Sequence, residues 1–87
     1  MLKGKTASGF SYEISQDRLN NYELLEIISE LKDQPYLLPK MVKMLLGDEQ
    51  KQKLADHLRT PEGFVPMDAM EKEILEIFNS QIKLKNS

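Results

Sequence analysis

PYLLPKMVKMLLG, residues 35–47, is the most hydrophobic stretch of this 87-residue chain. At about 100° per residue its apolar side chains cover well over half of a helix circumference, and only Lys40 and Lys43 occupy the remaining sector. A surface helix needs an apolar stripe only a little wider than about 100°. The stretch therefore predicts a helix over residues 37–46 that is covered on more than one side, at the centre of the fold.

The ends of this central helix are marked by residues that restrict the backbone. Pro39 is acceptable only in the first turn of a helix, so the regular helix is expected to start between Tyr36 and Leu38. Gly47 is a C-terminal stop, and Asp48 can cap a following helix over residues 49–59. That following helix has a thin apolar stripe and is expected at the periphery.

The N-terminal residues 1–15 predict a β-hairpin. Phe10, Tyr12 and Ile14 alternate with polar residues, which places them on one face of a strand. Ser8-Gly9 predicts a two-residue turn that pairs residues 2–7 with 10–15. Because an isolated hairpin is marginally stable in water, its apolar face is expected to pack on the helices.

Two further helices are predicted, over residues 20–33 and 67–79. Asn20 and Glu23 fit a capping box at the start of the first, and its expected buried face is Leu24, Leu25, Ile27, Ile28 and Leu31. The second helix opens after Pro66, which follows a turn at residues 60–63 and a short extended piece, Phe64-Val65, expected at the hairpin edge. Residues 81–87 are expected to fray.

These elements define the expected fold class. The chain is predicted to be one small α+β domain, predominantly α, over residues 1–80, with the N-terminal hairpin packed on a bundle of about four short helices. At this length a single core is only just sufficient for stability.

Composition narrows the class of function. The sequence contains no Cys. Its formal net charge is −2, so no global attraction to nucleic acid or to an anionic membrane is expected. No stretch approaches the ~20 apolar residues of a membrane span. A cytoplasmic protein is the expectation.

No catalytic, cofactor-binding or metal-binding site is predicted. His57 is the only histidine, and no nucleophile-elbow motif surrounds any of the serines. The corner at Gly47 raises a helix-turn-helix DNA-binding regulator as an alternative. Its second helix mixes acidic and basic residues, whereas a recognition helix is expected to carry a basic excess.

Three segments carry a resemblance to a known family: NNYELLE at residues 20–26, LPKMVKMLLGDEQ at 38–50 and GFVPMDAM at 63–70. Together with the opening strands, the layout over about residues 9–78 resembles the tail assembly chaperones of long-tailed bacteriophages and prophages of Gram-positive bacteria. The resemblance implies a non-enzymatic role in the bacterial host cytoplasm. Such proteins keep the tape-measure protein soluble and recruit the major tail protein around it.

Protein binding is therefore the leading hypothesis, and a generic interaction module or the DNA-binding regulator are the alternatives. Self-association is a further expectation for so small a domain. The candidate docking residues are apolar side chains at helical spacing: Met41, Met44, Met67, Met70 and Phe78. The alternative is that the two methionine pairs pack inward against each other.

Overall fold

The central helix of the fold is α3 (Leu38–Leu58), which contains most of the hydrophobic stretch. The computed structural model describes residues 1–86, and the side chains of residues 1–82. The first half of α3 has its buried side chains on several sides of the helix: Leu38, Met41, Val42, Leu45 and Leu46. A short 3₁₀ helix, η1 (Pro35–Leu37), leads into α3. The predicted central position of this stretch is confirmed.

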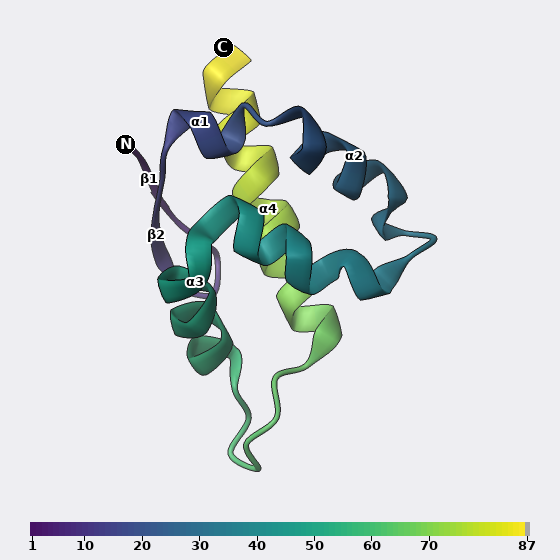
Figure 1. Cartoon of the computed structure of the whole chain (residues 1–87). Helices are drawn as coiled ribbons and strands as arrows, with labels where there is room; N and C mark the ends of the chain where they lie inside the picture. Colours follow the sequence, from purple (N-terminus) through teal and green to yellow (C-terminus); the bar gives the residue numbers. More distant parts are fainter. Residues whose placement is uncertain (87) are drawn as a thin grey trace.

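At Gly47 the backbone leaves the helical region (φ 82°, ψ 166°), and α3 bends there. The bend separates the two helices that were expected at residues 37–46 and 49–59 (Figure 1). The Arg18 guanidinium covers the bend, because its Nη1 donates to the carbonyl oxygens of Lys43 (3.3 Å) and Met44 (2.9 Å). These are the carbonyl groups that a helix end leaves without an intrahelical partner.

The hairpin consists of β1 (Leu2–Lys5) and β2 (Ser11–Ile14), paired antiparallel. Its Phe10, Tyr12 and Ile14 side chains are buried, as the alternation predicted. The four described helices and this two-stranded sheet confirm the predicted α+β, mostly α class.

The hairpin loop differs from the predicted two-residue turn. Thr6 pairs with Phe10, and the loop is Ala7-Ser8-Gly9, with a hydrogen bond from the Gly9 N–H to the Thr6 carbonyl (2.9 Å). Gly9 has a φ of 98°. A three-residue loop that ends in a left-handed glycine is the next most common hairpin geometry.

Both edges of the small sheet are covered by glutamine side chains. The Gln50 amide pairs with the outer edge of β2: it accepts from the Glu13 N–H (2.8 Å) and donates to the Glu13 carbonyl (2.6 Å). On the β1 side, Gln81 Nε2 lies 3.5 Å from the Lys3 carbonyl. Each contact occupies backbone groups of one edge residue, Glu13 or Lys3, that an added strand would otherwise use.

A short helix, α1 (Gln16–Leu19), was not predicted and precedes α2 (Tyr22–Leu31). The cap of α2 is Asn21 and not Asn20, because the Asn21 side chain accepts from the Glu23 N–H (3.0 Å) while Asn20 ends α1. The buried face of α2 is Leu24, Ile27 and Leu31. Leu25, which was expected on that face, is 53% exposed.

The last helix, α4 (Met67–Asn86), is longer than predicted. Gln81 is buried and its Nε2 donates to the Tyr12 hydroxyl (2.9 Å), so the predicted end at residue 79 and the frayed tail from residue 81 are wrong. The polar Gln81 continues the buried face of α4 because Tyr12 satisfies its amide. Ser87, the last residue of the predicted tail, lies outside the described residues.

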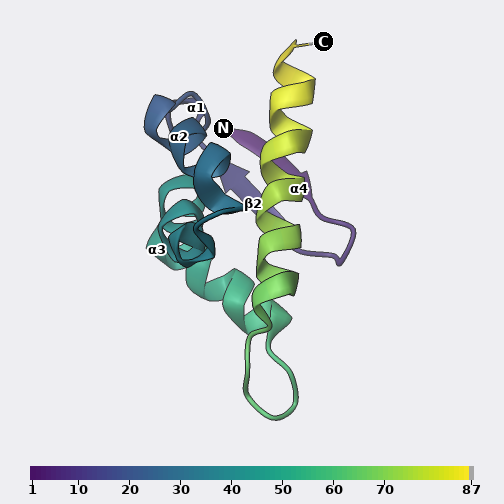
Figure 2. The same ribbon diagram turned by 90° about the vertical axis from the view of Figure 1, so that its right-hand side faces the viewer.

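The loop between α3 and α4 lies at the opposite end of the molecule from the end of α4 (Figures 1 and 2). The predicted turn at residues 60–63 is present, with the Gly63 N–H donating to the Thr60 carbonyl (2.9 Å). Phe64 and Val65 were expected at the hairpin edge. They lie in this loop instead, and Phe64 is exposed.

Candidate functional site

The structure separates the five predicted docking residues. Met41 is fully buried (0% exposed) and Phe78 is buried, so the expectation that they are exposed is wrong. Met44 and Met70 are partly buried and pack against the core. Met67 is 81% exposed. Spacing of three residues places two methionines on one helix face, but it does not say whether that face points inward or outward.

An apolar groove lies between the start of α2 and the second half of α4. Its volume is about 300 Å³. Seven residues line it: Leu19, Asn20, Asn21, Tyr22, Leu25, Phe78 and Ile82. Phe78 is thus a buried wall of the groove, while Tyr22 and Leu25 are exposed at its lip. Phe78 is the one predicted docking residue in this lining. Leu25 was not among the predicted docking residues, and its i, i+3 spacing from Tyr22 was the available signal.

The outer face of α2 beside this groove is acidic. Four exposed carboxylates follow one another on α2 and just after it: Glu23, Glu26, Glu30 and Asp33. None of them forms an ion pair with a residue whose side chain the structure describes. The groove itself is lined by uncharged side chains. Of the four carboxylates, Glu26 follows the lining residue Tyr22 by four positions, so the acidic face of α2 begins beyond Tyr22.

A polar cluster joins the hairpin loop to α3 and α4. The buried Glu73 carboxylate accepts from the Thr6 hydroxyl (2.8 Å) and the Ser8 hydroxyl (2.7 Å) at the same oxygen, Oε1. Ser8 Oγ also lies 3.0 Å from His57 Nε2. The Ala7 N–H donates to Glu76 Oε2 (2.7 Å).

The arrangement of protons in this cluster favours a structural role for Ser8. Because its hydroxyl proton is donated to Glu73, His57 Nε2 must carry the proton in the Ser8–His57 hydrogen bond. A serine nucleophile needs the reverse arrangement, with its proton directed at the histidine. The N–H groups of Ala7, Gly9 and Phe10 are all donated within the protein, so they offer no oxyanion hole.

The cluster holds the hairpin loop over the core. Phe10 lies against the His57 ring, with ring centroids 5.7 Å apart and an interplanar angle of 46°. Nothing in the sequence indicated this cluster, because Ser8 and His57 are 49 positions apart and belong to different elements. No group of three or more His, Cys, Asp or Glu side chains suited to a metal ion occurs in the described part of the chain.

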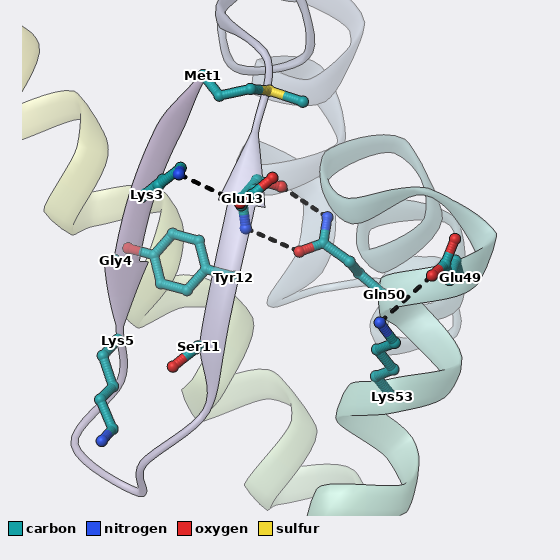
Figure 3. Close-up of a pocket in the computed structure, with 10 residues that line it drawn as sticks. All are labelled: Met1, Lys3, Gly4, Lys5, Ser11, Tyr12, Glu13, Glu49, Gln50 and Lys53. Atoms are coloured by element: carbon teal, nitrogen blue, oxygen red, sulfur yellow. Dashed lines mark hydrogen bonds and ion pairs between the residues drawn. The ribbon is translucent and has the colours of Figure 1, made fainter.

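A wider, shallow concavity lies between the hairpin and the second half of α3, with a volume of about 830 Å³ (Figure 3). Two of its lysines face carboxylates: Lys3 lies 3.5 Å from Glu13, and Lys53 lies 3.3 Å from Glu49. Lys5 points away from both pairs (Figure 3). Because two of its three lysines are paired with carboxylates and Lys5 lies apart from them, this surface has no clustered positive charge for an anion.

Part of the basic side chains of the second half of α3 are paired with carboxylates. Lys53 lies 3.3 Å from Glu49, and Arg59, just after the helix, lies 3.1 Å from Asp56, while Lys51 is in no ion pair with a side chain that the structure describes. A helix that enters the major groove of DNA is expected to offer unpaired basic groups to phosphates. This pairing disfavours the helix-turn-helix alternative.

Comparison with models of known protein families, with curated proteins and with solved structures found no match to this chain. No helix in the described residues is long and apolar enough to cross a membrane.

Proposed function

We propose that this protein is a non-enzymatic chaperone of bacteriophage tail assembly that holds amphipathic helices of the tape-measure protein in the α2–α4 groove. The observation that carries the proposal is the apolar groove with exposed Tyr22 and Leu25 at its lip. The resemblance to tail assembly chaperones supplies the identity of the client.

The shape of the site suits a helix. Grooves between two helices accept the apolar face of a third helix through side chains at i, i+3, i+4 and i+7. A floor of Leu19, Phe78 and Ile82 offers apolar surface to such a face. The proposed contact is made by side chains and does not use the edges of the hairpin.

The charge of the site sets a preference among helices. A client helix with Lys or Arg beside its apolar stripe could approach the carboxylates of α2, which form no ion pair with a side chain that the structure describes. At physiological ionic strength the screening length is about 8 Å, so only basic groups close to these carboxylates contribute. The proposed client segment is therefore a basic amphipathic helix, and acidic helices would be disfavoured.

The major tail protein is proposed as the second partner, on the basis of the resemblance. In this role the protein acts in the cytoplasm of the bacterial host, while the tape-measure protein is being covered by tail-tube subunits. The groove is proposed for the tape-measure protein only.

The test is co-expression with the tape-measure protein of the same phage or prophage. Leu25→Glu places a carboxylate in the apolar lip, whereas Ser29→Glu adds the same charge at an exposed position of α2 that does not line the groove. Wild-type protein and Ser29→Glu should keep the tape-measure protein soluble, and Leu25→Glu should lose this effect. Equal solubility with Leu25→Glu would contradict the proposed site.

A parallel titration with duplex DNA at low salt tests the alternative. The proposal predicts no binding that weakens steeply as salt increases, which is the signature of phosphate contacts. Tight, salt-sensitive DNA binding without any effect on the tape-measure protein would favour the regulator.

A further inference from the structure

The loop between α3 and α4 presents an ordered but exposed aromatic side chain. Residues 60–67 form what we call the tip. Phe64 is 73% exposed there, and Met67 beside it is also exposed. Burying a Phe side chain removes about 150–250 Å² of surface from water. The isolated chain therefore does not gain the favourable free energy that burial of the Phe64 ring would give.

The backbone of the tip is held in place by several hydrogen bonds. The Thr60 N–H donates to the Phe64 carbonyl (2.7 Å), and the Phe64 N–H donates to the Thr60 hydroxyl (3.2 Å). Arg59 Nη1 donates to the Gly63 carbonyl (2.9 Å). Since Phe64 sits on a fixed turn, little backbone entropy remains to be lost when a partner covers it.

Phe64 cannot reach the apolar groove of its own chain. Phe78 and Ile82, which line the groove, lie about 16–22 Å along α4 from Met67 at ~1.5 Å per residue. Both views show the tip and the end of α4 at opposite ends of the molecule (Figures 1 and 2). The chain therefore has an apolar protrusion at one end and an apolar hollow towards the other.

The groove is suited to this protrusion in size and chemistry. Its volume of about 300 Å³ is enough for an aromatic ring, and Leu19, Leu25 and Phe78 supply apolar walls. Asn21 at the lip uses its side-chain oxygen to cap α2, which leaves its NH₂ group as a donor for a carbonyl oxygen of an incoming turn. The groove thus offers an apolar floor to the ring and a polar edge to the turn.

We propose that copies of this chain associate head to tail, with Phe64 of one copy in the α2–α4 groove of the next. The contact joins two different surfaces, so it is heterologous and continues into a ring or an open row of subunits instead of stopping at a symmetric dimer. This inference goes beyond the proposed function. It also implies that self-association and client binding exclude each other, because both occupy the same groove.

The experiment uses two variants that each damage one side of the contact. Phe64→Ser removes the protrusion and leaves the groove intact, whereas Leu25→Glu blocks the groove and leaves the tip intact. Both positions are exposed, so the variants should melt as the wild type does. Tyr36→Ser, which removes an equally exposed aromatic from η1, is the matched control.

Sedimentation velocity is run at about 0.1–1 mM protein, because a contact this small belongs to the weak class of interfaces. Wild type and Tyr36→Ser should form species larger than a dimer as concentration rises, and each of the two variants alone should stay monomeric. A mixture of Phe64→Ser and Leu25→Glu should form a 1:1 dimer and nothing larger, because only one productive contact remains.

Three results would overturn the inference: monomeric wild type throughout this range, undiminished association of Phe64→Ser, or a mixture that stays monomeric. Client binding is measured separately with monomeric Phe64→Ser. That variant should still solubilise the tape-measure protein if the proposed function holds. If Phe64→Ser did not solubilise the tape-measure protein while the sedimentation results were as expected, the proposed function alone would be rejected.

Discussion

Two turns of this molecule have the same sequence pattern and the same hydrogen bonds, but opposite surroundings. Residues 6–10 (TASGF) and 60–64 (TPEGF) both follow Thr-x-x-Gly-Phe. In each, the glycine N–H donates to the threonine carbonyl at 2.9 Å, and the Phe N–H donates to the threonine hydroxyl. The glycine φ angles are 98° and 97°.

The two phenylalanines differ in burial. Phe10 is 6% exposed, while Phe64 is exposed. The first turn is held against α3 and α4 through hydrogen bonds to His57 and Glu73. The second turn accepts a side-chain hydrogen bond from Arg59, the residue directly before it in the chain. Five residues are therefore enough to build the turn, but the rest of the chain decides whether its aromatic side chain is buried in the core or exposed on the surface.

The largest expected difference in stability between the two turns is found when their phenylalanines are substituted. Phe10→Ala should lower the free energy of unfolding by about 3–5 kcal/mol, because it removes a buried ring and leaves a cavity. Phe64→Ala should change it by less than about 0.5 kcal/mol, as is usual at exposed positions. Urea unfolding of both variants measures the difference. Similar losses at the two positions would mean that Phe64 also belongs to the core.

Substitution of the two threonines should give a smaller difference in stability than substitution of the two phenylalanines. Thr6→Val removes a hydroxyl that donates to the buried Glu73 carboxylate, and should cost about 1–3 kcal/mol. Thr60→Val removes only an exposed bond to the Phe64 N–H, which water can replace, and should cost about 0.5–1 kcal/mol. Thermal melts of the two variants compare them. Equal costs would show that the contact with Glu73 adds nothing to the stability of the first turn.

Substitution of the two glycines by alanine should lower the stability of the protein by the same amount. An alanine at either position must adopt a left-handed conformation, which costs about 1–2 kcal/mol. A Cβ at either position would meet no atom within 4 Å, so no packing term separates them. Gly9→Ala and Gly63→Ala should therefore lose equal stability, within about 0.5 kcal/mol. A clear difference in their urea midpoints would show that the two turns are not locally equivalent.

The same contrast between local and distant causes explains which features could be predicted from the sequence. The bend at Gly47, the start of α3 with Pro39 in its first turn and the inward face of Phe10, Tyr12 and Ile14 depend on backbone restrictions and side-chain periodicity. These features were predicted. The short helix α1 was missed, because the four residues from Gln16 to Leu19 are too few to show a helical period.

Features that depend on distant partners were not predictable. Gln81 appeared to belong to a polar tail, but the Tyr12 hydroxyl, 69 positions away, makes it part of the buried face of α4. Phe78 was among the predicted docking residues, but its place in the wall of a groove depends on Leu19, Tyr22 and Leu25, which α1 and α2 bring opposite α4. Burial of Met41 likewise depends on how many elements surround the first half of α3.

Direct observation of the groove during client binding shows whether the groove holds the tape-measure protein. Phe64→Ser protein with labelled methyl groups is titrated with a basic amphipathic segment of the tape-measure protein, and methyl NMR shifts are recorded. We expect shifts at Leu19, Leu25 and Ile82, with the buried Leu45 unchanged. Binding that shifts only methyl groups away from the groove, such as that of Met67, or no binding of the segment at all, would contradict this expectation.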